Sequence, residues 1–201
     1  MEGHAMHAAW ITSVTLFWRD IVGPEQWFSS TASLDVEIRK RFEHLWRKAW
    51  IGALDAWADT PEGALALILV LDQFPRRMFR GAPESWLTDE LAREIANHAI
   101  ARGDDLTIEG PMRQFFYAPF LHAEELRAQE RGLALIEERM PAGHLPDARA
   151  RHMVIRRFGR FPWRNAVVGR RSSDEEAAFL WAGGYDWALR RQSETGQGRA
   201  A

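Results

Sequence analysis

An arginine-rich turn, residues 156–165, carries the residue types best suited to binding an anion. It reads Arg-Arg-Phe-Gly-Arg-Phe-Pro-Trp-Arg-Asn. Its glycine and proline are typical of a turn, which can direct side chains towards a ligand. Guanidinium groups among aromatic side chains are partly desolvated, and there they bind carboxylates and phosphates best. The turn therefore predicts a clamp in which Arg160 and Arg164 bind a carboxylate or phosphate and Asn165 orients that ligand.

A histidine that precedes this turn extends its basic character. His152, Arg156 and Arg160 recur every four residues, so they share one face if a helix continues that far. Such a face fits an anion site, but it is equally typical of a solvated basic surface with salt bridges. The spacing alone leaves both interpretations open.

Asp72 is a second candidate because it follows the most apolar stretch of the chain. Residues 64–71 read Ala-Leu-Ala-Leu-Ile-Leu-Val-Leu, which predicts a central, buried helix. A carboxylate there must be paired or hydrogen-bonded, because an isolated buried charge is very costly. One interpretation is a structural Asp–Arg bridge near Pro75, where we expect the helix to stop or kink. The other is an acid/base or ligand-binding carboxylate.

His122 is the third candidate, and it follows a nearly unbroken aromatic run. Glu125 comes three residues later and would share a helix face with it. The pair predicts either a structural histidine that holds the turn at Pro119 or a general acid or base oriented by a carboxylate. A metal site would need further ligands, such as Asp72 or His152. One His-x-x-Glu pair is a weak metal signal, so we predict no metal.

Composition excludes several classes of function. The 201 residues are 46% hydrophobic and 27% charged, with a formal net charge of −2. This charge argues against a nucleic-acid binder that relies on bulk charge. The chain has no cysteine, which excludes disulfides, thiol catalysis and thiolate metal sites.

We expect neither a membrane partner nor an export signal. The longest apolar run, 64–71, is much shorter than the roughly 20 residues of a membrane span. Residues 1–6 lack the basic and apolar segments of a signal peptide. These features, and a cysteine-free sequence that suits a reducing compartment, predict a cytoplasmic protein.

Helical signals follow one another along the chain. The segment 35–51 is the clearest amphipathic helix, Thr60-Pro61 is a strong helix start, and residues 173–176 form a capping box. Further helices are expected over residues 8–20, 88–102, 112–118, 121–140 and 147–158. No segment shows the alternation typical of strands.

These elements predict an all-α fold, a compact array of antiparallel helix pairs. We expect a single domain over residues 1–189. The polar residues 190–201 are expected to form a disordered tail.

Three motifs spread along the chain are specific in combination. They are Leu-Asp-Gln-Phe-Pro-Arg at 71–76 with Phe-Arg-Gly at 79–81, Phe-Tyr-Ala-Pro-Phe-Leu-His-Ala-Glu at 116–124, and Arg-Phe-Gly-Arg-Phe-Pro-Trp-Arg-Asn at 157–165. With Gly-Arg-Arg-Ser-Ser-Asp-Glu-Glu at 169–176, they resemble the bacterial domain-of-unknown-function family numbered 924 over nearly the whole chain. The resemblance implies a tetratricopeptide-like helical fold and no established activity.

The resemblance also marks the polar positions of these motifs as candidate site residues. The catalytic candidates are His122, Asp72 and Glu124, and the ligand-binding candidates are Arg76, Arg80, Arg160, Trp163, Arg164, Asn165 and Arg170. The family usually carries a histidine at the position of Trp163. If that histidine were a base or a metal ligand, this chain has lost it, which leaves His122 as the best acid/base candidate. Equally, Trp163 would suit a pocket for a flat ligand.

Three functions are consistent with these residues. In the first, which we prefer, the motifs converge on an internal pocket for a small anionic or carboxylate-bearing molecule, and any chemistry is hydrolysis or proton transfer without an organic cofactor. In the second, the chain is a tetratricopeptide-like module that binds a peptide or protein. In the third, the motifs are buried salt bridges that fix the helix register. The sequence does not predict an oligomeric state.

Overall fold

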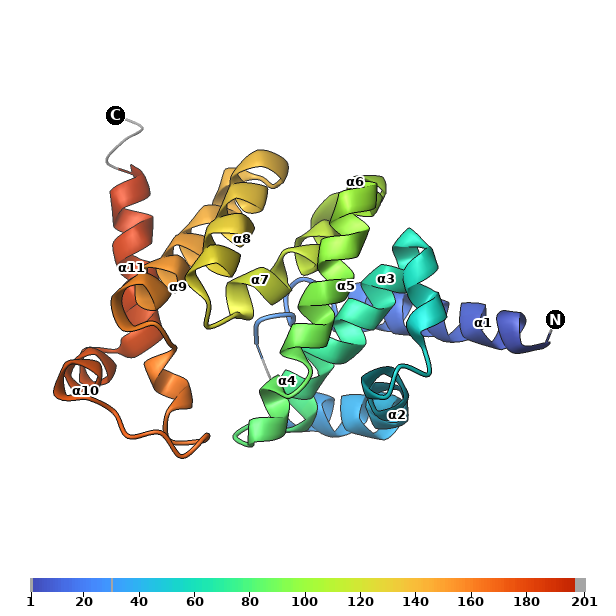
Figure 1. Ribbon diagram of the computed structural model, residues 1–201, viewed down its shortest axis with the longest axis horizontal. Coiled ribbons are helices and arrows are strands. Elements are labelled where there is room, and N and C mark those ends of the chain that lie inside the picture. The colour runs from blue at the N-terminus through green and yellow to red at the C-terminus, as the bar shows by residue number, and fades with distance from the viewer. Residues whose placement is uncertain (1, 30, 198–201) are drawn as a thin grey trace. The chain divides into compact units, whose positions relative to one another are not determined.

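Most of the chain that the structure describes is helical. A computed structural model describes residues 2–29 and 31–197, and across them it contains eleven α-helices and no strand (Figure 1). This confirms the predicted all-α class, while the tetratricopeptide-like arrangement stays a prediction.

The α-helices are α1 Glu2–Leu16, α2 Ala32–Trp50, α3 Pro61–Ile68, α4 Phe74–Met78, α5 Asp89–Arg102, α6 Asp104–Thr107, α7 Ala118–His122, α8 Leu126–Arg139, α9 Leu145–Phe158, α10 Asp174–Trp181 and α11 Gly184–Gln197. Short 3₁₀-helices are Asp55–Asp59, Pro83–Trp86, Gly110–Phe116, Ala142–His144 and Pro162–Arg164, and π-helical segments are Phe17–Val22 and Leu69–Gln73.

Two compact units make up the chain, Met1–Pro119 and Phe120–Ala201, where the sequence predicts one domain over residues 1–189. The C-terminal tail also differs from its prediction, because residues 190–197 belong to α11. This helix packs on α9, and Ala188 enters the core between them, so tertiary packing supports a segment with weak local signals. Residues 198–201 of the predicted tail lie outside the described residues.

Helix α3 is the centre of the first unit, as its sequence predicts. Every residue from Gly63 to Ile68 is buried, and α3 packs against α1 and α5. The hydroxyl of Thr60 accepts a hydrogen bond of 3.2 Å from the Gly63 N–H, which confirms the predicted N-cap. None of the described helices is long and apolar enough to cross a membrane.

The chain stays helical through Pro75 instead of stopping there. The segment Leu69–Gln73 is π-helical, and the Phe74 N–H bonds the carbonyl of Leu69, five residues back. A proline ring clashes with the carbonyl four residues back in a regular α-helix. The wider π turn relieves that conflict, so α4 continues directly and places Pro75 in its first turn.

Arg77 ties the loop between the π-helical segment Phe17–Val22 and α2 to α4. Its side chain is buried, and the guanidinium donates hydrogen bonds of 2.5–2.8 Å to the main-chain carbonyls of residues 26, 27 and 29. Arg77 also lies 4.0 Å from Asp35. Burial lowers the pKa of this guanidinium, and Asp35 opposes that effect. A loop without secondary structure of its own is thereby fixed by one side chain.

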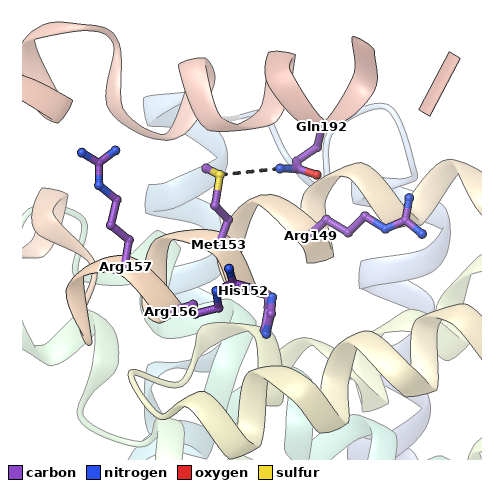
Figure 2. Close-up of a pocket in the computed structure, with 6 residues that line it drawn as sticks. All are labelled: Arg149, His152, Met153, Arg156, Arg157 and Gln192. Carbon is purple, nitrogen blue, oxygen red and sulfur yellow. Dashed lines mark hydrogen bonds between the residues drawn. The ribbon is translucent and has the colours of Figure 1, made fainter. Parts of the chain in front are cut away.

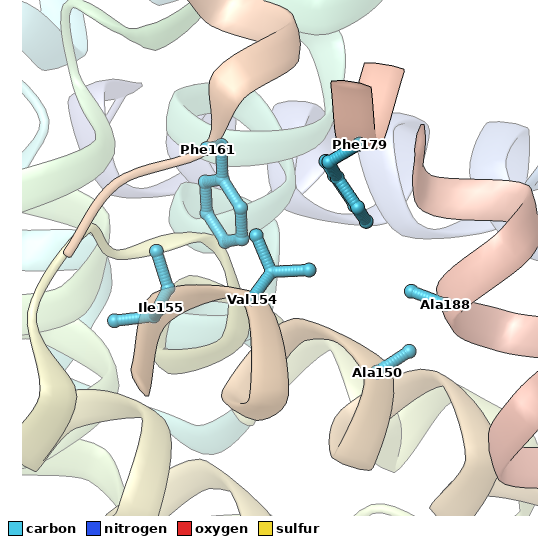
Figure 3. Close-up of a cluster of buried hydrophobic side chains, with 6 residues drawn as sticks. All are labelled: Ala150, Val154, Ile155, Phe161, Phe179 and Ala188. Carbon is cyan, nitrogen blue, oxygen red and sulfur yellow. The ribbon is translucent and has the colours of Figure 1, made fainter. Parts of the chain in front are cut away.

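The second unit is built around α9, which packs against α8 and α11. Its apolar core is small, and Figure 3 shows the core side chains converging from α9, α10, α11 and the turn after α9. These residues are Ala150, Val154, Ile155, Phe161, Phe179 and Ala188. The capping box predicted at Ser173 is confirmed, and it fixes the start of α10.

A break between α7 and α8 separates His122 from Glu125. The sequence predicts one helix over residues 121–140, but α7 ends at His122 and α8 begins at Leu126. The buried Gln129 amide stabilises the break, because it donates hydrogen bonds of 2.8–3.2 Å to the main-chain carbonyls of residues 120, 121 and 123. Carbonyls satisfied in this way need no helical partner. The prediction that His122 and Glu125 share a helix face is therefore wrong.

Candidate functional site

The predicted site residues fall into both units. Asp72, Arg76 and Arg80 belong to the first unit, and the other candidates belong to the second: His122, Glu124, Arg160, Trp163, Arg164, Asn165 and Arg170. Each group is held together by contacts of its own.

In the first unit, the candidates form salt bridges with neighbouring carboxylates. Asp72 is completely buried, accepts a hydrogen bond of 2.6 Å from Gln73 Nε2, and lies 3.3 Å from Arg76. Arg76 also donates two hydrogen bonds of 2.9 Å to Asp89 at the start of α5. An Asp–Arg bridge is thus present at the end of the apolar helix, and the Arg76–Asp89 pair joins α4 to α5. These contacts stabilise the fold, and the predicted ligand-binding role of Arg76 stays a prediction.

Arg80 follows the same pattern at the surface. Its guanidinium lies 2.9 Å from the carboxylate of Asp35 at the start of α2. The side chain of Arg80 is 55% exposed, so the pair contributes little to stability. Binding of a ligand by Arg80 would have to compete with this contact.

Glu124 is the centre of the polar network in the second unit. Both of its oxygens accept hydrogen bonds from Arg170, at 2.6 and 2.8 Å, and Oε1 also accepts one of 2.8 Å from the Phe161 main-chain N–H. Burial alone would raise the pKa of Glu124, but Arg170, Phe161 and Arg164 together lower it below its usual value. Glu124 is therefore an ionised anchor for the turn after α9, and its predicted catalytic role stays a prediction.

Arg160 is held by a carboxylate of α10, that of Glu176. Helix α9 ends at Phe158, and Gly159 has a left-handed conformation with φ of +68°, so Arg160 lies beyond the helix and does not continue the face of His152 and Arg156. It donates two hydrogen bonds of 2.6 and 2.8 Å to Glu176. The Ser173 N–H donates a third, of 2.8 Å, to the same carboxylate.

Asn165 and Arg164 complete this turn. Asn165 Nδ2 donates a hydrogen bond of 3.1 Å to the Ser172 hydroxyl. The buried Arg164 donates one of 2.9 Å to the main-chain carbonyl of His122, and its guanidinium lies 4.8 Å from the centre of the Phe161 ring. Both predicted clamp arginines therefore contact groups of the protein itself.

Trp163 is part of an aromatic stack at the edge of the core. Its ring lies on the Phe161 ring, with centroids 4.7 Å apart and planes inclined by 25°, and it meets the Tyr185 ring edge-on at 5.7 Å. The side chain is only partly buried. Trp163 thus stabilises the second unit and also presents a partly open aromatic surface.

A second polar cluster joins α9 to α11, and of its members only His122 is a candidate from the sequence. The Tyr185 hydroxyl donates a hydrogen bond to Asp147. Arg151 Nε donates to both oxygens of the same carboxylate, at 3.0 and 3.2 Å, and its guanidinium lies 5.0 Å from the centre of the Tyr185 ring. His122 lies close enough to lower the pKa of Asp147. We call Asp147, Arg151, Tyr185 and His122 the Asp147 cluster.

Burial has the largest influence on the ionisation of this cluster. It raises the pKa of the Tyr185 hydroxyl well above its usual value, so the hydroxyl stays protonated. Burial also acts to raise the pKa of Asp147, but Arg151, Tyr185 and His122 outweigh it and keep the carboxylate ionised. The pKa of neighbouring His144 is lowered by burial, with Asp147 opposing the change. The protonated phenol is therefore a hydrogen-bond donor held against an ionised acceptor.

A hollow between α9 and α11 has a basic lining (Figure 2). Its volume is about 540 Å³. The lining residues are Arg149, His152, Met153, Arg156, Arg157 and Gln192, of which none is acidic and none is Phe, Tyr or Trp. We call this feature the basic hollow. Of the face proposed from the sequence, it contains His152 and Arg156 but not Arg160.

Comparison with known proteins places the chain in a family. A family model described as "Bacterial protein of unknown function (DUF924)" matches residues 9–184. The chain belongs to this family. It is also similar to the solved structure of a protein of unknown function, ATU0120, from Agrobacterium tumefaciens, with 39% sequence identity and a TM-score of 0.84. That similarity covers 88% of this chain and 99% of the other, and no curated protein matches.

Membership of DUF924 accounts for the motifs but not for the basic hollow or the Asp147 cluster. Signals for both were present in the sequence of α9. Asp147 and Arg151 are four residues apart, which is the spacing of a helical salt bridge. Arg149, Met153 and Arg157 share the same spacing on another face. Apart from Arg157, which begins the motif at 157–165, neither set lies in the DUF924 motifs.

The described part of this DUF924 chain contains no cluster of side chains that could bind a metal ion. Among residues 2–29 and 31–197, no three His, Asp or Glu side chains are grouped so that they could hold a metal ion. Asp147 instead has a cation, Arg151, as its hydrogen-bonding partner.

Proposed function

We propose that this chain binds a small carboxylate- or phosphate-bearing anion in the basic hollow. The observation that supports this most directly is the lining itself, with Arg149, His152, Arg156 and Arg157 and no acidic residue. Arginine side chains donate hydrogen bonds in a fork that matches both carboxylates and phosphates. The ligand is an anion, as the sequence predicts, but its site contains Arg156 and Arg157 instead of Arg160 and Arg164.

The state of the arginines supports this choice of site. Arg160 and Arg170 make short, paired hydrogen bonds to Glu176 and Glu124, and a ligand would have to break them. By contrast, Arg156 is exposed on α9. An exposed guanidinium in a hollow without carboxylates in its lining is more readily available to an anion.

The size of the hollow also suits a small molecule. Ligand sites in proteins typically have volumes of about 300–1,000 Å³, and the basic hollow has about 540 Å³. Met153 adds an apolar surface and Gln192 an amide to the lining. An organic anion would thus find contacts for its charged groups and for its carbon skeleton.

Removing Arg156 is expected to weaken anion binding by about tenfold, the effect of losing one charge-assisted hydrogen bond of roughly 1.5 kcal/mol. Isothermal titration of citrate and of inorganic phosphate into the wild type, Arg156→Ala and His152→Ala measures this. Arg127→Ala is the matched control, because it removes the same charge from an exposed position of α8 that is not part of the hollow. Equal affinities in all variants, or no binding by the wild type, would contradict the proposal.

Acid/base catalysis at the Asp147 cluster is a second candidate function. It is favoured by the contact of an ionised carboxylate with a protonated Tyr185 and by the proximity of His122. Tyr185 would act as a proton donor and His122 as a base, with Asp147 positioning both. This arrangement retains His122 as acid/base and replaces the orienting carboxylates predicted from the sequence.

Hydrolysis of p-nitrophenyl acetate and p-nitrophenyl phosphate tests this second candidate. Turnover by the wild type should fall by about 100-fold in Tyr185→Phe, the usual range for losing a general acid, with the helical content unchanged by circular dichroism. Turnover that is absent in the wild type, or unchanged in Tyr185→Phe, would argue against catalysis at this cluster.

A further inference from the structure

We infer that the ligand of the basic hollow is an acidic peptide in an extended conformation, with two carboxylates that reach Arg149 and Arg157. This inference rests on the proposed function and names the ligand class of the same site. It follows from the spacing of the basic side chains, from the partners that they already have, and from the residues between them.

The two arginines bound the hollow along α9. Figure 2 shows Arg149 and Arg157 on either side of Met153 and Gln192. Arg149, Met153 and Arg157 are each four residues apart, so they share one face of the helix. At a rise of 1.5 Å per residue, the Cα atoms of the two arginines are separated by about 12 Å along the helix axis. A compact anion such as phosphate contacts one of them, whereas an elongated ligand with a charge at each end contacts both.

An extended peptide reproduces this spacing. Side chains in an extended chain alternate between two faces, and each residue adds about 3.3 Å. Two acidic residues four positions apart therefore point the same way and are about 13 Å apart. Adjacent acidic residues point in opposite directions and cannot reach both arginines at once.

The present partners of the two arginines are carboxylates. Arg149 lies 2.9 Å from Glu137, and Arg157 lies 2.7 Å from Glu175. The side chains of these glutamates are 46% and 62% exposed. Exposed salt bridges of this kind contribute about 0–1 kcal/mol to stability. Glutamates of a ligand can therefore take the place of Glu137 and Glu175. The arginines are already oriented for a carboxylate, which favours an acidic peptide over a phosphate compound.

The centre of the hollow suits a peptide backbone. Gln192 Nε2 lies 3.6 Å from the sulfur of Met153, and a thioether is only a weak acceptor. A peptide carbonyl is a much stronger acceptor, so it can take this donor from Met153. The flexible methionine side chain then adapts to the apolar part of the peptide. A nucleotide is disfavoured, because the six lining residues include no Phe, Tyr or Trp on which a base would stack.

Fluorescence anisotropy with labelled eight-residue peptides tests the inference. The peptides are capped at both ends, have glycine and serine as spacers, and carry two glutamates either four positions apart or adjacent, or two glutamines four positions apart. We expect the four-position glutamate peptide to bind about tenfold more tightly than the other two. Arg149→Ala and Arg157→Ala should each remove this preference, while the Arg127→Ala control should keep it.

Variants that bind the four-position peptide more tightly than the wild type provide a complementary test. Glu137→Gln and Glu175→Gln remove the competing carboxylates of the protein, so each should tighten binding of the four-position peptide by two- to fivefold. A merely structural role of these pairs would leave the affinity unchanged or lower. Because both glutamates are exposed, neither variant should unfold the protein.

The outcomes separate this inference from the proposed function. If citrate or phosphate binds in a manner that depends on Arg156 but the peptides do not bind, or bind without regard to spacing, the peptide inference is overturned and the anion site remains. Equal binding of the glutamine peptide would also overturn it, because the carboxylates would not be recognised. Binding of neither the peptides nor the small anions would overturn both.

Discussion

Replacing Arg77 by leucine is expected to lower the free energy of unfolding by about 3–5 kcal/mol, the usual cost of removing one partner from a buried charged network. The guanidinium of Arg77 satisfies three main-chain carbonyls, those of residues 26, 27 and 29. Leucine keeps part of the volume but leaves these carbonyls without their donor, at about 1–3 kcal/mol for each that stays buried. Urea unfolding followed by circular dichroism and tryptophan fluorescence measures the loss.

Arg80→Leu is the matched control for this prediction. Arg80 lies three residues later and pairs with Asp35, but its side chain is 55% exposed against 7% for Arg77. An exposed pair contributes about 0–1 kcal/mol, so Arg80→Leu should be close to the wild type. A loss of similar size in both variants would show that Arg77 acts by charge alone and not by anchoring the loop.

Glu176→Gln is expected to destabilise the second unit and to change how stability depends on pH. Burial opposes the effect, but hydrogen bonds from Arg160 and Ser173 lower the pKa of Glu176 from 4.5 to about 2. A carboxyl whose pKa is lower in the folded state stabilises the fold above its unfolded pKa, and this contribution is lost as the pH falls through the folded pKa. For a shift of this size the contribution is on the order of 3 kcal/mol at neutral pH.

The pH dependence distinguishes this effect from a general loss of packing. The wild type should lose the contribution of Glu176 as the pH falls from about 4.5 to about 2. Glu176→Gln should lack it at every pH, so the two curves should differ most at neutral pH and converge near pH 2. Urea unfolding at several pH values provides the curves. Parallel curves would rule out the ionised carboxylate as the source of stability.

Glu175→Gln is the natural comparison, because it changes the neighbouring residue in the same helical turn. Glu175 pairs with Arg157, yet its side chain is 62% exposed, whereas Glu176 is 3% exposed. The Glu175 variant should therefore unfold within about 1 kcal/mol of the wild type at every pH. The pair of variants isolates burial as the variable that makes one salt bridge strong and the other weak.

The local features of this chain could be predicted from its sequence, because they depend on neighbouring residues. Thr60 and Ser173 are caps in the structure as predicted, since a cap needs only its own side chain and an N–H within the next turn. The apolar run of α3 is buried as predicted. The family motifs were likewise recognised from the order of the residues alone, and the family model over residues 9–184 agrees.

Only the tertiary structure decided which polar side chains far apart in the sequence are partners. Nothing near Gln129 in the sequence shows that its amide ends α7 by binding carbonyls six to nine residues earlier. The sequence likewise does not show that Glu124 binds Arg170, 46 residues later, or that Tyr185 binds Asp147, 38 residues earlier.

Such contacts depend on the packing of elements distant in the chain, which residue spacing does not encode. The sequence by itself therefore determined the helical class, the caps, the buried helix and the family. Tertiary packing decided that Arg76, Arg160 and Arg170 bind the protein's own carboxylates. It also decided that a basic hollow forms where α9 meets α11.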